Sequence, residues 1–125
     1  MKIYTDIEQS KKLAEIVPAY TADISYESWT YDNGVTALIA NLGPVKSKNI
    51  PAWSLTALID LFPAFKGDDM PTFSLTRGGW VPSFTENWFA TWGNWSFNAR
   101  EPIDAVVGLI LLLKENNFEF YNPLY

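Results

Sequence analysis

The sequence contains no cysteine and no histidine among its 125 residues. The lack of cysteine excludes a disulfide framework, thiol catalysis and cysteine-ligated metal sites. The lack of histidine removes the usual general base near neutral pH and the commonest metal ligand. The adjacent carboxylates Asp68 and Asp69 lack the further ligands that an EF-hand loop supplies. We therefore predict no metal, no cofactor and no enzymatic activity.

Charge is sparse and long apolar runs are missing. Charged residues make up 18% of the chain, and its net charge is −5. The basic residues are scattered, so we expect no nucleic-acid partner. The longest apolar run, residues 105–113, is far shorter than the ~20 residues that cross a bilayer. The N-terminal residues have no apolar core of the kind found in signal peptides. These features predict a cytoplasmic protein without membrane contact.

Apolar residues, by contrast, are plentiful at 48% of the chain. This content excludes general disorder. A chain of this length buries about two-thirds of its surface on folding, which is enough for a core without disulfides. We expect a single domain over residues 1–125.

Three segments have helical spacing. Residues 6–17 carry a loose apolar stripe, and Thr5 with Glu8 has the pattern of a capping box. Pro51 stands where a first helical residue is favoured. Four apolar residues follow it at helical spacing: Leu55, Leu58, Ile59 and Phe62. Pro102 opens a last helix that is apolar on almost every side, which is typical of a helix that is central or meets a partner.

Strand patterns fall into two blocks. Residues 23–31 and 35–42 flank Asn33-Gly34, a strong signal for a hairpin with a type I′ turn. The apolar residues of 35–42 lie on both faces, so we expect this strand to be more buried than its partner. The second block holds shorter candidate strands at 72–76, 80–85, 88–92 and 95–98. The order α-ββ-α-ββ(ββ)-α predicts an α+β fold, with an antiparallel sheet of two hairpin blocks and three helices packed on one face.

Three stretches also resemble a group of known sequences. They are residues 3–16 (IYTDIEQSKKLAEI), 50–63 (IPAWSLTALIDLFP) and 101–118 (EPIDAVVGLILLLKENNF). In this order and spacing they resemble small uncharacterised proteins encoded by phages and mobile elements of gut anaerobes, in which the final helix opens with a similar Pro-Ile-Asp-Ala pattern. The resemblance implies no activity. It implies a mobile-element origin, a setting in the host cytoplasm and, by association, a role in binding a host or defence component.

Tryptophan is concentrated in one part of the chain. Residues 80–97 hold four of the six tryptophans: Trp80, Trp88, Trp92 and Trp95. These rings either fill the core under the helices or form a binding face, since large amphipathic rings are enriched at interfaces. We take the four as a candidate aromatic binding face. The candidate polar contacts beside it are Arg77, Asn94 and Arg100.

Two functions fit these features. The leading hypothesis is a non-enzymatic protein-binding module whose partner is a host protein or a second copy of the chain. A homodimer would form through the last helix and the aromatic C-terminal tail, residues 118–125. The alternative is a small-molecule binding protein that holds a sugar or a nucleotide in an aromatic pocket. A flat exposed tryptophan patch would favour the first hypothesis, and a concave pocket with convergent polar groups the second.

Overall fold

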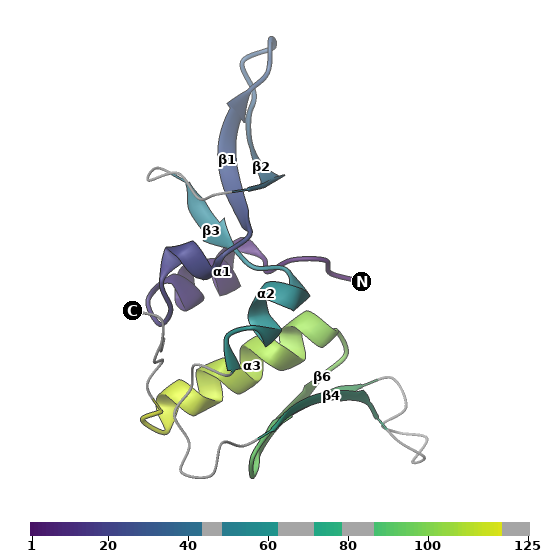
Figure 1. The fold of residues 1–125 in the computed structure, drawn as a ribbon. Helices are drawn as coiled ribbons and strands as arrows, with labels where there is room; N and C mark the ends of the chain where they lie inside the picture. The colour runs from purple at the N-terminus through teal and green to yellow at the C-terminus, as the bar shows by residue number, and fades with distance from the viewer. Residues whose placement is uncertain (44–48, 63–71, 79–86, 119–125) are drawn as a thin grey trace.

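The computed structural model describes residues 1–43, 49–62, 72–78 and 87–118 (Figure 1). These residues form three α-helices and two three-stranded antiparallel sheets, which confirms the predicted α+β class. The predicted strand at 80–85 lies outside the described residues. The elements are α1 (Ile7–Ala14), the 3₁₀ turn η1 (Ala19–Thr21), β1 (Ile24–Thr30), β2 (Thr36–Leu42), β3 (Ile50–Ala52), α2 (Leu55–Ile59), β4 (Phe73–Arg77), β5 (Trp88–Trp92), β6 (Trp95–Ala99) and α3 (Pro102–Glu115).

Helix α1 is capped one residue later than the sequence predicts. Asp6 is the N-cap: its carboxylate accepts a hydrogen bond from the Gln9 N–H at 2.8 Å, and the Gln9 side chain accepts from the Asp6 N–H at 3.0 Å. The predicted box of Thr5 and Glu8 is wrong because Thr5 has another role. Thr5 is fully buried, and its hydroxyl accepts a hydrogen bond from the Trp53 N–H at 3.1 Å.

The first sheet has the strand order β2-β1-β3. β1 pairs with β2 in continuous antiparallel register over the whole of both strands. The Tyr31 N–H donates to the Val35 carbonyl at 2.8 Å and closes the loop between them. Gly34 has a positive φ of 83°, but Asn33 does not. The loop is therefore not the predicted type I′ turn, which needs positive φ at both central residues.

Pro51 lies in a strand and not at a helix start. It belongs to β3, an edge strand that pairs with the beginning of β1. A proline is tolerated there because an edge strand does not need every N–H. α2 begins at Leu55 instead, since the Ser54 hydroxyl accepts a backbone N–H of the first turn. Of the predicted helical stripe, Leu58 is buried, whereas Leu55 and Ile59 are only partly buried, and Phe62 is buried beyond the end of α2.

The tryptophan-rich block forms a second sheet with the order β4-β5-β6. The two hairpin blocks thus build separate sheets, whereas the sequence had suggested a single sheet with the helices on one face. The physical reason is helix α3. It packs against β5 and β6 on one side and against α2 on another, so the helices lie between the sheets (Figure 1).

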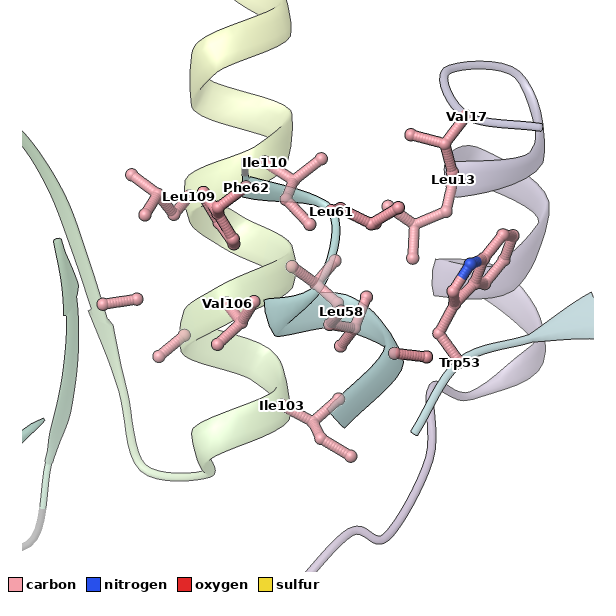
Figure 2. Packing of buried hydrophobic residues seen from close by; sticks show 14 of the residues in the cluster. Leu13, Val17, Trp53, Leu58, Leu61, Phe62, Ile103, Val106, Leu109 and Ile110 are labelled. Carbon is pink, nitrogen blue, oxygen red and sulfur yellow. The ribbon is translucent and has the colours of Figure 1, made fainter. Parts of the chain in front are cut away.

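Helix α3 is the centre of the main core. Eight of its 14 residues are buried, so the helix that is apolar on almost every side is a central one. Figure 2 shows Leu58 of α2 between α3 and the buried side chains of Leu13 and Trp53. Within the described residues, no helix combines the length and the apolar character needed to cross a membrane.

Candidate functional site

The β1–β2 hairpin, residues 24–42, extends away from the helices and is called the arm below (Figure 1). At its base Ile24, Ser25 and Tyr26 are buried. From Ser28 onward every residue of β1 is exposed, and no residue of β2 is buried. The arm therefore has a packed base and an outer part that faces solvent.

The base of the arm is anchored by packing and by a buried hydrogen bond. Ile24 and Tyr26 form a small second core with Ala52 of β3. The Tyr26 hydroxyl donates to the Thr5 carbonyl at 2.7 Å, and its ring meets the Tyr4 ring edge-on at 5.9 Å between centroids. Burial raises the pKa of Tyr26 above its usual value. These contacts join the base of the arm to the N-terminal segment and to β3.

One face of the arm is aromatic. Residues opposite each other in an antiparallel pair point to the same side of the sheet. The register therefore places Trp29, Tyr31 and Val35 on one side of the hairpin. Trp29 is 56% exposed, and the other two are about half exposed at 47% and 54%. We call these three residues the aromatic face of the arm.

Strand β2 contradicts the prediction that it is more buried than its partner. Its apolar residues do lie on both faces of the strand, but its burial pattern is mostly exposed while the first half of β1 is buried. Leu42 is 85% exposed and Leu38 is 45% exposed. The prediction is wrong because no element within the described residues packs over the outer arm. Exposed apolar groups that gather in this way are typical of an interaction site.

The tryptophans predicted as a binding face lie in or against the core. Trp92 pairs with Trp95 across β5 and β6, and alternation along β5 brings Trp88 to the same face. That face packs against α3. Trp92 is only 2% exposed and meets Phe118 edge-on at 5.3 Å, so it is a core residue and not part of a binding face. Trp88 and Trp95 are half-buried against the same core, and Trp80 lies outside the described residues.

The three polar candidates do not converge. Arg77 ends β4 opposite Trp88, and Arg100 follows β6 at the same end of the sheet. Asn94 lies in the β5–β6 turn at the other end. The described residues therefore do not bring these side chains together around a single ligand.

A groove of about 370 Å³ lies elsewhere, between α1, β6 and α3. On its polar side the Lys2 ammonium group donates to Asp104 at 2.8 Å and to Asp6 at 3.1 Å. The hydrogen bond to Asp104 is the main cause that raises the pKa of Lys2. Burial alone would raise the pKa of Asp6, but hydrogen bonds from Gln9 and Lys2 outweigh it and lower that pKa. The apolar side is formed by Phe97, Val107, Gly108 and Leu111.

The apolar residues of α3 that suggested a homodimer are mostly inside the core of one chain. The tail after Phe118 lies outside the described residues. Dimerisation through α3 and the tail therefore stays a prediction.

The remaining chemistry of the described residues is limited. Among them no group of three or more acidic side chains is placed to hold a metal ion. No known protein family, curated protein or solved structure matches the chain. The aromatic face of the arm is thus the candidate functional site of the described residues.

The aromatic face was missed at the level of sequence, although a signal for it exists. Trp29 and Tyr31 stand directly before the Asn33-Gly34 turn, which places them at the tip of a hairpin. A hairpin tip is the part of a sheet that is hardest to cover with a helix. Two large aromatic rings at that position therefore favour exposure over burial.

Proposed function

We propose that the chain is a non-enzymatic protein-binding module that contacts its partner through the aromatic face of the arm. The observation that carries this proposal is the joint exposure of Trp29, Tyr31 and Val35 on a hairpin whose base is packed. Tryptophan and tyrosine are enriched among the residues that dominate binding energy at protein interfaces. The resemblance to phage and mobile-element proteins supports a host protein as the partner.

The charge distribution supports an apolar contact. Asp32 is the only charged residue between positions 28 and 42, although the whole chain carries a net charge of −5. The core of a protein interface is depleted in charged residues and rich in aromatic ones. The outer part of the arm, residues 28–42, has this composition, so a partner with an exposed apolar patch or pocket fits it best.

A matched pair of tyrosine variants tests the proposal. Tyr31 lies on the aromatic face, whereas Tyr20 is similarly exposed at 56% but lies on η1, away from the arm. The tagged wild-type chain and the tagged Tyr20→Ser variant are each used to capture proteins from a lysate of a gut anaerobe. Both are expected to recover the same host protein, in a fixed ratio of host protein to tagged chain. Tyr31→Ser is expected to recover at least about tenfold less, as for loss of an interface anchor. Equal recovery by the two variants, or no protein recovered in a fixed ratio, would contradict the proposal.

Small-molecule binding is a second candidate function, favoured by the groove beside Lys2. Its volume of about 370 Å³ falls within the ~300–1,000 Å³ of ligand sites. Leu111→Lys would place a charged chain in the apolar side of the groove. If sugars or nucleotides raise the melting temperature of the wild type but not of this variant, the groove is the binding site. If no such ligand shifts the melting temperature, this second candidate fails.

A further inference from the structure

Within the described residues no strand pairs with the outer edge of β2, and this free edge presents regularly spaced backbone groups. The Tyr31 N–H donates to the Val35 carbonyl at one end of the hairpin, and the Gly43 N–H donates to the Asp23 carbonyl at the other. Both hydrogen bonds join odd-numbered residues next to the ends of the two strands. Bonded and non-bonded pairs alternate along an antiparallel ladder. The odd-numbered residues of β2 therefore direct their backbone groups to β1. The even-numbered residues direct theirs outward, to the free edge: Thr36, Leu38, Ala40 and Leu42.

This edge lacks the features that keep sheet edges from pairing. Proteins usually protect edge strands with charge, proline, a bulge or short length. β3, at the other edge of the same sheet, is short and contains Pro51. β2 (TALIANL) has seven residues, no charged residue, no proline and an unbroken register. The two edges of one sheet thus differ, and only β2 is suited to accept another strand.

We propose that β2 of two copies pair antiparallel about a two-fold axis at Ile39, which joins two three-stranded sheets into one. In this register Thr36 bonds with the partner's Leu42, and Leu38 bonds with the partner's Ala40. Every outward-facing donor and acceptor of the four even-numbered residues is then paired. If either strand is shifted along the edge, the outward N–H and carbonyl groups at one end have no partner. This register therefore pairs the largest number of outward backbone groups. At the axis, Ile39 lies directly opposite the partner's Ile39.

A second copy fits this edge for reasons of chemistry. Each chain carries a net charge of −5, so copies meet with least repulsion where the strand is uncharged. An isologous contact is also the commonest arrangement in oligomers. Pairing brings a neighbouring strand beside Leu42, whose side chain is 85% exposed in the single chain. The helical parts of the two copies then lie at opposite ends of the joined sheet.

This inference goes beyond the proposed function, because it uses the backbone edge of β2 and not the side chains of the aromatic face. Trp29 and Tyr31 lie on β1 or beyond it, one strand away from the new contact. A dimer would therefore present two aromatic faces on the same side of the joined sheet.

The test is the mass of the full chain in solution, measured by sedimentation equilibrium over a range of concentrations. The wild type is expected at twice the 14.2 kDa of one chain. Ile39→Glu places like charges directly opposite at the axis, and Glu27 of the same chain, opposite position 39, adds to them. This variant alone is therefore expected to be monomeric. The lysine of Ile39→Lys can pair with Glu27, so this variant serves as the oppositely charged partner for Ile39→Glu. An equimolar mixture of the two is expected to return to the dimer mass. Val35→Lys makes the same change outside the paired residues and is expected to stay dimeric.

Leu38→Pro is a second, independent variant. It removes an N–H that points away from β1, so the chain keeps its own hairpin while the edge loses a donor. It is expected to be monomeric with an unchanged circular dichroism spectrum. A monomeric wild type, a dimeric Ile39→Glu or a mixture that stays monomeric would overturn the inference. A monomeric wild type whose host partner is still lost in Tyr31→Ser would overturn the dimer but leave the proposed function in place.

Discussion

Leu42 and Leu58 offer a direct comparison between a side chain that the fold does not need and one that it does. Leu42 is 85% exposed at the end of β2, whereas Leu58 of α2 is fully buried in the core that α2 forms with α3. Burying a whole leucine side chain is worth about 1.5–3 kcal/mol, so the buried part of Leu42 contributes only ~0.2–0.5 kcal/mol. Alanine is also less favoured than leucine in a strand, which adds some tenths of a kcal/mol.

We therefore expect Leu42→Ala to lower the free energy of unfolding by less than ~1 kcal/mol. Leu58→Ala leaves a cavity in the core and is expected to cost ~2–5 kcal/mol. Urea denaturation followed by circular dichroism measures both values, at a protein concentration where sedimentation shows monomers. The dependence of the unfolding free energy on urea should be the same for both variants and the wild type.

The result that refutes this reasoning is an equal cost for the two substitutions. If Leu42→Ala destabilises the monomer as much as Leu58→Ala does, then Leu42 is packed in solution. The end of β2 would then be covered and not exposed, and the proposal that its edge pairs with a second copy would lose its basis.

Three further predictions concern the contacts that hold the fold. Thr5→Val leaves the buried Trp53 N–H without its acceptor and is expected to cost ~1–3 kcal/mol; Thr5→Ser, which keeps the hydroxyl, should cost less in the same urea titration. The pKa of Asp6 is lowered in the folded chain. Its contribution to stability is therefore complete above pH ~4 and is lost as the pH falls through the lowered value. Asn at position 6 can still cap the helix but does not titrate, so the free energy of unfolding of Asp6→Asn should fall less between pH 5 and pH 2 than that of the wild type. A Cβ atom at Gly108 would overlap the Phe97 ring. Alanine is favoured over glycine in a helix by ~1 kcal/mol, so Gly108→Ala should stabilise the chain by this amount only when Phe97 is also replaced by alanine. A double-mutant cycle of the two substitutions measures this coupling.

Local patterns predicted most elements of the fold. The α+β class, the β1–β2 hairpin and the strands around Trp88 and Trp95 follow from alternation and turn residues. The central position of α3 follows from its apolar residues on almost every side. Each of these signals lies within a short segment, so the sequence contains it. The cap of α1 was misplaced by one residue because Thr5 and Asp6 are both good N-caps, and only the distant Trp53 decides between them.

The candidate site was predicted poorly, because exposure depends on what packs over a strand. The apolar β2 was expected inside, yet the helices that could cover it gather around α3 instead. Trp92 was expected on a binding face, yet it shares a sheet face with Trp88 and Trp95 that packs against α3. Alternation alone shows that these rings share a face, but which face a helix covers depends on contacts between segments far apart in the sequence.

Photo-crosslinking at the aromatic face tests the central claim most directly. A photoreactive phenylalanine analogue placed at Trp29 of the full chain is exposed to light in cells of a gut anaerobe, with the same analogue at Tyr20 as the control. Both positions are 56% exposed, so they offer equal access to chance encounters. The account predicts one discrete adduct with a second protein from position 29 and none from position 20. No adduct from position 29, or the same adducts from both positions, would contradict it.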